Sequence, residues 1–538
     1  MITGEVGVFL LFAIAALADD APVVDTTAGS VRGFTSRSRS GRSYLSYTGI
    51  PFAKPPVEEL RFRSPEEPEP WTGIRNATEN GPFCIQYNVN LHSFNSKVIG
   101  SEDCLYLSVF THNTKDTAPV LVHIHGGGFT AGDKSMTSPI YFMDEDVVVV
   151  AINYRLGIMG FLSFEDNEQP GNQGMKDQVM ALKWIQKNIA KFGGDPNRVT
   201  LVGDSAGGAS AIHHIISPLS RGLFHGAIAE SGSSYNTWTV LPPGLPRSRA
   251  SNLTSLASCP FNSTREIVRC LQKKNASDLV GLVEHFREWQ IDPLLLVFQP
   301  ALEPKSSEAF LTGPLSSWEH NSVPLLIGMT SGEGLLRTKF FLEYNMDFKW
   351  YNDNFEKVAP ITFLYVASAS NPDEVTRKIK QYYFGNKEIT AADWQNVTHA
   401  YSDSWFYAGI LETANKHTGD VYFYYFDYIG EYTYAPKNRT LAVGAGHSEE
   451  VPYIWYKKSA PNLKGSDLEL SIKLVKIWSN FAKYGKPVSA ESNFIWPTWT
   501  PTRHRFMKIS NSGFKMNEGL HESRYNFWSS LNYRDKYL

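Results

Sequence analysis

The pentapeptide Gly203-Asp204-Ser205-Ala206-Gly207 constrains the fold more than any other part of the chain. Residues 199–202 have the β-branched composition of a strand, and residues 206–216 have the pattern of a helix. A serine between two glycines at such a junction predicts a sharp, strained elbow that holds the hydroxyl above the edge of a sheet. The start of the following helix adds positive potential beside that hydroxyl. We therefore expect Ser205 to be a nucleophile.

Short apolar strands alternate with helical stretches through much of the chain. Residues 174–190 carry apolar side chains three and four positions apart, which predicts a helix. Strands are expected at residues 120–124, 147–154, 199–202, 227–229, 323–328 and 421–426. This alternation predicts an α/β fold with a large, mostly parallel, twisted sheet and helices on both faces.

A chain of 538 residues is long enough for three or four domains of ordinary size. However, no repeat, charge block or low-complexity linker divides it, and a parallel sheet can grow by adding units. The residues 1–18 contain an apolar run that ends in Ala16-Leu17-Ala18, the pattern of a signal peptide, although Glu5 replaces the usual basic residue; a buried N-terminal helix is the alternative. We expect a signal peptide at 1–18 and a single domain at 19–538.

No later apolar run is long enough to cross a membrane, so we expect a secreted, extracellular protein without a membrane anchor. Four cysteines fall in two close pairs, for which an oxidising compartment favours local disulfides, although four cysteines allow three connectivities. Six N-glycosylation sequons mark candidate surface sites. They are Asn76, Asn252, Asn262, Asn275, Asn396 and Asn438.

The charges of the chain nearly cancel, with 51 basic and 54 acidic residues. A chain without a basic excess gives no reason to expect nucleic acid as a partner. His123 and His125 lie on one face of a predicted strand, but two ligands alone make a poor metal site. We therefore expect no metal and no cofactor.

The segment His125-Gly126-Gly127-Gly128-Phe129 follows a predicted strand about 80 residues before the elbow. Such a glycine-rich loop supplies backbone amides for an oxyanion hole when it is paired with a serine elbow. In this architecture the acid and the base follow the serine in that order. The candidates are Glu333, just past the strand VPLLIG, and His447, in a glycine-rich loop after VYFYYFDYIG.

Several further segments, together with the elbow, resemble the carboxylesterase/cholinesterase family (type-B carboxylesterases) of α/β-hydrolases, from about residue 22 to about residue 506. They are Gly49-Ile50-Pro51-Phe52-Ala53, Ser101-Glu102-Asp103-Cys104-Leu105-Tyr106-Leu107, Asn153-Tyr154-Arg155-Leu156-Gly157, Phe192-Gly193-Gly194-Asp195-Pro196 and Trp478-Ser479-Asn480-Phe481-Ala482. Within these segments, we interpret Glu102, Asp195 and Arg155 as structural ion-pair or turn residues.

The resemblance implies an α/β-hydrolase fold and a Ser205–His447–Glu333 triad. It also implies a set of supporting residues. These are Gly127, Gly128 and Ala206 as the oxyanion hole, Trp238 and Phe129 at the substrate, Ser231 beside the triad, and disulfides Cys84–Cys104 and Cys259–Cys270. Two departures stand out: Asp204 replaces a usual glutamate, and the third disulfide of cholinesterases has no counterpart.

The resemblance implies two-step ester hydrolysis through an acyl-enzyme, by a protein similar to secreted insect carboxylesterases. Cholinesterases stack the choline ammonium on a tryptophan between the first two cysteines, and here that segment contains none. We therefore expect small apolar alkyl or aryl esters, either xenobiotic or odorant- and pheromone-like, as substrates of a monomer or homodimer. A juvenile-hormone esterase is an alternative, although such enzymes usually carry glutamine where Asp204 stands. A triacylglycerol lipase and a non-catalytic cholinesterase-like adhesion protein remain further alternatives.

Overall fold

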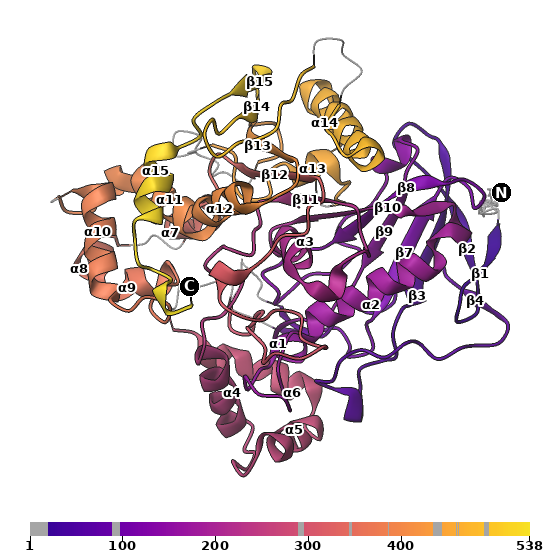
Figure 1. Cartoon of the computed structure of the whole chain (residues 1–538), viewed down its shortest axis with the longest axis horizontal. Coiled ribbons are helices and arrows are strands. Elements are labelled where there is room, and N and C mark those ends of the chain that lie inside the picture. Colours follow the sequence, from indigo (N-terminus) through magenta and orange to yellow (C-terminus); the bar gives the residue numbers. More distant parts are fainter. Residues whose placement is uncertain are drawn as a thin grey trace, which may run out of the picture.

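The computed structural model describes most of the chain, and its architecture is a large central sheet with helices packed on both faces (Figure 1). The described residues are 20–88, 97–288, 295–343, 347–385, 387–433, 444–458, 460, 462–488 and 494–537. The expected signal peptide and the sequon at Asn438 lie outside them.

The sheet has 13 strands and is parallel through its centre. In spatial order its strands are β1 (Asp20–Asp25), β2 (Ser30–Arg37), β3 (Ser43–Pro51), β7 (Tyr106–Thr111), β9 (Val148–Ile152), β8 (Ala118–Ile124), β10 (Gly194–Asp204), β11 (Gly226–Glu230), β12 (Leu325–Thr330), β13 (Val421–Asp427), β14 (Phe506–Ser510) and β15 (Gly513–Asn517). A short strand, β4 (Ile74–Asn76), pairs with β2, while β5 (Gln86–Asn88) and β6 (Lys97–Ile99) form a separate pair.

Neighbouring strands are parallel from β9 to β14 and antiparallel from β1 to β9 and between β14 and β15. The mostly parallel sheet predicted from the sequence is therefore confirmed. Two helices were also predicted, and they correspond to α2 (Gln173–Asn188) and α3 (Ala206–Ile216).

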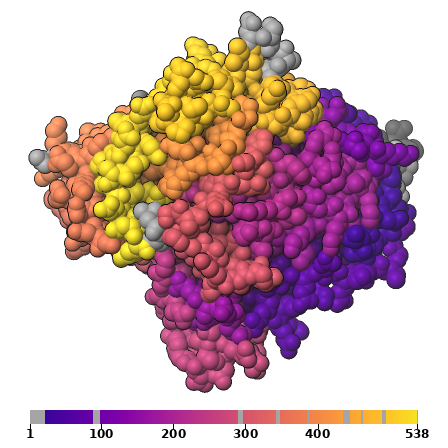
Figure 2. All heavy atoms as spheres, in the orientation of Figure 1, coloured from indigo at the N-terminus to yellow at the C-terminus, as the bar shows by residue number. Residues whose placement is uncertain are grey.

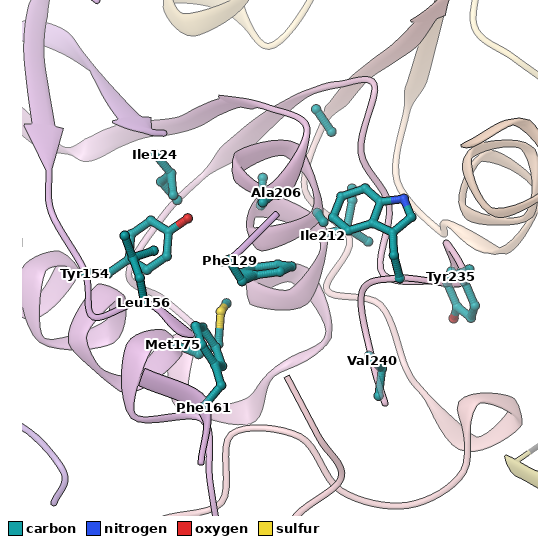
Figure 3. Close-up of a cluster of buried hydrophobic side chains, with 14 of the residues drawn as sticks. Ile124, Phe129, Tyr154, Leu156, Phe161, Met175, Ala206, Ile212, Tyr235 and Val240 are labelled. Atoms are coloured by element: carbon teal, nitrogen blue, oxygen red, sulfur yellow. The ribbon is translucent and has the colours of Figure 1, made fainter. Parts of the chain in front are cut away.

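Helices cover both faces of the central sheet, and side chains alternate between these faces along each strand. Both sets of side chains in the central strands are therefore buried. Ile124 of β8 faces a core shared with Met175 of α2 and Ile212 of α3, part of which appears in Figure 3. Leu121, three positions earlier and therefore on the opposite face, faces a second core together with Trp478 of α14 (Gly465–Tyr484). This double burial explains the apolar strand runs in the sequence.

Two further groups of helices extend beyond the layered core, one at the bottom and one at the left of Figures 1 and 2. The first comprises α4 (Leu245–Leu256), α5 (Thr264–Gln272) and α6 (Ala276–Gly281). The second comprises α7 (Leu335–Glu343), α8 (Phe348–Asp353), α9 (Phe355–Thr362), α10 (Pro372–Phe384), α11 (Trp394–Ser402), α12 (Ala408–Lys416) and α15 (Glu522–Ser529). The short helix α1 (Gly157–Phe161) contacts α2, and the short helix α13 (Val451–Ile454) contacts α14.

The cysteines pair as the resemblance implies, with Cα atoms 4.9 Å apart in Cys84–Cys104 and 5.9 Å apart in Cys259–Cys270. The five sequon asparagines within the described residues are exposed. In the same part of the chain, no helix combines the length and the apolar character that a membrane crossing requires.

Candidate active site

The elbow places Ser205 between the end of β10 and the first residue of α3, with φ 56° and ψ −120°. Few residues other than glycine adopt a positive φ, so the surrounding structure must impose this strained conformation. A Cβ atom at Gly207 would collide with the carbonyl oxygen of Ile124, which explains the second glycine of the motif. The Ser205 amide donates to the carbonyl of Glu230 at 2.7 Å, and the side chain remains partly exposed.

The side chains of His447 and Glu333 are 7% and 0% exposed, and Nδ1 of the imidazole donates to Oε2 of the carboxylate at 2.6 Å. The second oxygen, Oε1, accepts from the Ser231 hydroxyl at 2.5 Å and from the Thr330 amide at 2.7 Å. These three donors fix the carboxylate. Because Nδ1 carries the donated proton, Nε2 of a neutral ring holds the lone pair and can act as a base.

Nε2 of His447 is buried and has no hydrogen-bond partner among the described residues. A catalytic base commonly makes its bond to the nucleophile closely only once substrate is present. The residues next to Ser205 and His447 are directly joined, since the Ser448 hydroxyl donates to Oδ2 of Asp204 at 3.0 Å. The structure thus holds the elbow and the histidine loop side by side.

The loops that carry the acid and the histidine are also joined to each other. Gly332 and Gly446 form a parallel β-bridge, and the Gly332 amide donates to the carbonyl of Ala445 at 2.7 Å. In return, the Ala445 amide donates to the Ser331 hydroxyl at 2.9 Å. Glu333 and His447 are 114 positions apart in the sequence, and these hydrogen bonds between their loops hold them next to each other.

The glycine-rich loop after β8 lies against the elbow. A Cβ atom built on Gly126 would stand 3.2 Å from Cβ of Ser205. Gly127 and Gly128 have φ values of 110° and 62°, and neither amide donates a backbone hydrogen bond among the described residues. Ala206 is the first residue of α3, so its amide has no acceptor within the helix. Within the described part of the chain, the amides of Gly127, Gly128 and Ala206 are thus unpaired on the loop and the helix start that adjoin Ser205, which makes them candidates for an oxyanion hole.

Phe129 and Trp238 occupy different positions relative to this loop. The Phe129 ring is fully buried in the cluster drawn in Figure 3, and its centroid lies 5.4 Å from that of the Phe161 ring. The ring of Trp238 lies 6.2 Å from that of Phe129 and is held by a bond from Nε1 to the carbonyl of Trp405 at 2.9 Å. Trp238 also lines a pocket, whereas Phe129 lines neither of the two pockets described next.

Thr130, just after the glycine loop, lines one mostly apolar pocket, and Leu296, which packs against Gly128, lines a second. The first, about 390 Å³, is lined by residues from the segment after Cys84 together with Thr130, Leu295 and Phe298. The second, about 490 Å³, is lined by Trp238, Leu296 and residues of the α4 and α9 regions. Consecutive leucines thus line different pockets, so the segment at 295–296 lies between the two.

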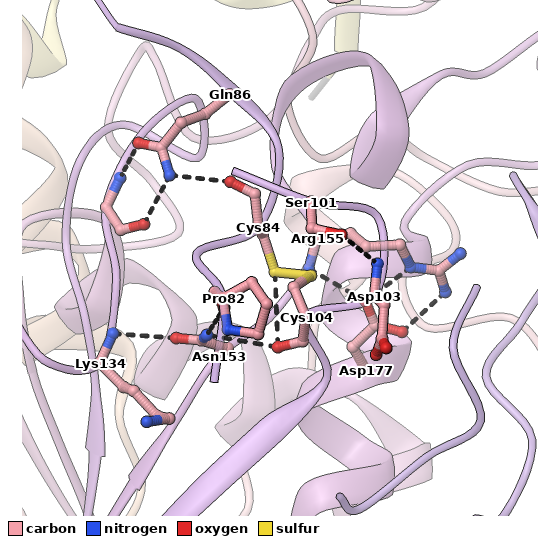
Figure 4. Close-up of a disulfide and its surroundings, with 11 residues drawn as sticks. Pro82, Cys84, Gln86, Ser101, Asp103, Cys104, Lys134, Asn153, Arg155 and Asp177 are labelled. Carbon is pink, nitrogen blue, oxygen red and sulfur yellow. Dashed lines mark hydrogen bonds and ion pairs between the residues drawn. A yellow bond between two sulfur atoms is a disulfide. The ribbon is translucent and has the colours of Figure 1, made fainter. Parts of the chain in front are cut away.

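The first disulfide is tied to the glycine loop through Gln86 (Figure 4). The Gln86 amide group donates to the carbonyls of Cys84 and Gly132, each at 2.9 Å, and its oxygen accepts from the Gly132 amide. Although Gln86 lines the first pocket, its amide nitrogen and oxygen both bond to the surrounding backbone.

The other singled-out polar residues have structural partners. Arg155 pairs with Asp177, Glu102 with Arg61, and Asp195 with Arg198, in agreement with the structural interpretation of these residues. His123 packs 4.4 Å from Trp455, and burial lowers its pKa to about 4; the His125 ring stacks on Tyr154. Within the described ranges, no group of three potential metal ligands is assembled.

Sequence reasoning missed one contact to the histidine. The ring of Phe406 lies 4.5 Å from the His447 ring. Phe406 belongs to a π-helical turn, Asp403–Tyr407 (η8), whose sequence DSWFY contains no catalytic motif. Only the tertiary structure reveals its proximity.

Comparison with known proteins finds a matching family, related sequences and a related solved structure. Residues 20–528 match the carboxylesterase family. Juvenile hormone esterase of Tribolium castaneum is 36% identical over 534 residues, which cover 93% of this chain and 90% of that protein. Esterase FE4 of Myzus persicae is 36% identical over 498 residues, which cover 89% and 87%. The crystal structure of juvenile hormone esterase from Manduca sexta, with OTFP covalently attached, matches with a TM-score of 0.82 and 27% identity over 95% of this chain and 99% of that one.

Proposed function

Since this chain belongs to the carboxylesterase family and is a carboxylic ester hydrolase, we propose that it cleaves esters through an acyl-enzyme formed on Ser205. One observation carries the assignment of the triad. The buried Glu333–His447 pair lies beside a strained serine elbow, with Ser231 and the Thr330 amide holding the carboxylate.

Each residue has a role that follows from its position. Nε2 of His447 accepts the hydroxyl proton as Ser205 attacks the ester carbonyl, while Glu333 orients the imidazole and stabilises its cationic form. The amides of Gly127, Gly128 and Ala206 bind the oxyanion. The imidazolium then protonates the departing alcohol, and water repeats the sequence to release the acid.

Replacing Ser205 with Ala tests this assignment. We expect kcat to fall by on the order of 10⁶-fold, because the nucleophile is removed. Ser217→Ala is the matched control: Ser217 caps the other end of α3, is buried, and its hydroxyl has no hydrogen-bond partner among the described residues. Undiminished turnover by Ser205→Ala would refute the triad, and an inactive parent protein would favour the adhesion alternative.

We propose apolar alkyl or aryl esters as the substrate class, with the acyl group beside Trp238 and the alcohol group in the pocket next to Thr130. Both pockets are lined mainly by apolar side chains, which supports this class. Choline esters are disfavoured because the described lining of the first pocket contains no tryptophan for the ammonium group. In this proposal Phe129 contributes by holding the oxyanion loop in place.

A juvenile-hormone ester is the second candidate substrate. The named relatives in Tribolium castaneum and Manduca sexta favour it. Asp204, which stands where such enzymes usually carry glutamine, weighs against it. A panel of acetates, longer-chain esters, a juvenile-hormone ester and acetylcholine, ranked by kcat/KM, decides between the candidates. A ranking headed by the hormone ester would replace the general-esterase proposal.

We also propose that the protein is secreted, with a signal peptide at 1–18 and one domain at 19–538. The two disulfides and the exposed sequons support an oxidising, glycosylating route. Expression in cultured cells, followed by N-terminal sequencing of the medium, tests it. A start at Asp19 is expected, and replacing Leu10 and Leu11 with Arg should retain the protein in the cells.

A further inference from the structure

The π-helical turn Asp403–Tyr407 touches the candidate active site through three consecutive residues. The Trp405 carbonyl accepts from Trp238, the Phe406 ring packs on His447, and the Tyr407 hydroxyl donates to the carbonyl of Thr330 at 2.8 Å. The amide of that same Thr330 binds the catalytic acid. Single π-turns within α-helices are uncommon and recur at functional sites, so this one calls for an explanation.

The first residue of the turn, Asp403, is 1% exposed and is held from the opposite side by the C-terminal helix α15. Nε of Arg524 donates to Oδ2 of Asp403 at 2.7 Å, and Nη2 donates to Oδ1. The Tyr383 hydroxyl also donates to Oδ2 and in turn accepts from Nε1 of Trp528 in α15. A two-pronged guanidinium bond of this kind fixes direction as well as distance.

Arg524 contacts the far end of the turn as well. Its guanidinium lies 4.9 Å above the centre of the Tyr407 ring. Arg524 of α15 therefore contacts both ends of the turn, Asp403 and Tyr407. Phe406, which lies between them in the sequence, packs against His447. Figure 1 shows α15 beside α11 and α12, the two helices that the turn connects.

We propose that Asp403 and Arg524 are positioning residues, which hold the π-helical turn so that Phe406 keeps the His447 imidazole aligned for proton transfer. The proposal rests on the Ser205–His447–Glu333 triad. The bond from Nδ1 to Glu333 restrains one edge of the imidazole, and the ring of Phe406 restrains its face. Without the second restraint the imidazole could tilt about the first, and small misplacements of reacting groups cost about 10²-fold in rate.

A purely structural role is the competing explanation, in which the ion pair only fastens the end of the chain. A second largely buried ion pair, with side chains 8% and 16% exposed, provides the matched control. Nη2 of Arg534 bonds to Glu412 of α12, and Nη1 donates to the carbonyl of Tyr235 at 2.5 Å. This pair also fastens the C-terminal segment to the same group of helices, but neither of its residues belongs to the turn.

The test compares two double variants, Asp403→Asn/Arg524→Met and Glu412→Gln/Arg534→Met. Replacing both partners avoids leaving one buried charge unpaired, which would endanger folding. Active sites are counted by covalent titration with an organophosphate, so that kcat refers only to folded, reactive molecules. We expect the first variant to lose at least tenfold in kcat with KM within twofold of the parent, and the control to keep kcat within twofold. Equal losses in both variants would overturn the proposal.

A conservative single variant and a coupling measurement sharpen the test. Arg524→Lys keeps the charge and one bond, so it should retain more of kcat than the first double variant does. If the pair acts through Phe406, replacing the pair in a Phe406→Leu background should lower kcat by much less than tenfold, because the shared effect is already lost. If the fold-losses in kcat from the pair and from Phe406→Leu simply multiply, the pair does not act through Phe406. Failure of either test with an active parent and an inactive Ser205→Ala leaves the triad intact.

Discussion

Glu230 is a buried acid directly behind the candidate nucleophile, and its removal should change how stability depends on pH. It ends β11, is 1% exposed, and accepts from Nε1 of Trp478 at 2.7 Å. Its other oxygen, Oε2, is buried without a hydrogen-bond partner among the described residues. Burial, followed by the negative charge of Asp204, raises the pKa of this carboxyl from 4.5 to about 8.

The sign of the effect follows from proton binding. Between pH 4.5 and about 8 the folded protein keeps a proton on Glu230 that the unfolded chain has released. The free energy of unfolding therefore falls as the pH rises through this window. At about 1.4 kcal/mol per pH unit, the complete effect amounts to roughly 5 kcal/mol. A Glu230→Gln variant cannot titrate, yet its side-chain oxygen can still accept from Trp478.

Urea unfolding of the parent and of Glu230→Gln at pH 5, 6.5 and 8 measures this difference. We expect the variant to gain several kcal/mol relative to the parent between the lowest and the highest pH. Glu450 is present in both proteins, and burial raises its pKa as well; because its titration is coupled to that of Glu230, the measured difference between the two proteins belongs to the pair. Glu469→Gln, on the exposed side of α14, should follow the parent. A difference between Glu230→Gln and the parent that stays constant from pH 5 to pH 8 would refute the reasoning.

Two further predictions concern the glycine-rich loop at 125–129 and the second disulfide. Gly127→Ala should lower kcat by about 10²–10³-fold, the loss typical of one oxyanion donor, because the added Cβ would collide with the Ala131 carbonyl and displace the Gly127 amide. Steady-state kinetics on a soluble ester measure this loss, and a kcat equal to that of the parent would contradict the prediction. Replacing Cys259 and Cys270 with Ser should lower the free energy of unfolding by about 3 kcal/mol, since the disulfide closes a loop with a sequence separation of 11. Urea unfolding at neutral pH measures this change, and an unchanged unfolding midpoint would refute the prediction.

The elbow could be predicted from the sequence because its determinants are local. The two glycines, the serine and the flanking strand and helix patterns lie within residues 199–216, and the structure places α3 at the predicted bounds. Apolar strands buried on both faces, such as β8 and β12, were equally readable, since their composition reflects burial rather than a particular partner.

The edges of the sheet were harder to predict. The strand β2, with the sequence SVRGFTSR, alternates weakly between buried and exposed positions, and its pairing with β3 depends on register rather than composition. The contact between Phe406 and His447 could not be predicted at all. It depends on a π-turn set by Asp403 and on α15, which lies more than 100 residues further along the chain.

The β-bridge between Gly332 and Gly446 has a consequence for protein engineering. Because hydrogen bonds through Ser331 and Ala445 join the acid loop to the histidine loop, the two loops form one interlocked piece. Grafting only one of these loops from a related esterase would disturb the hydrogen bonds between them. We expect this to tilt the His447 imidazole relative to the Glu333 carboxylate. Chimaeras of this enzyme should therefore exchange residues 331–333 and 444–449 together, as a matched set.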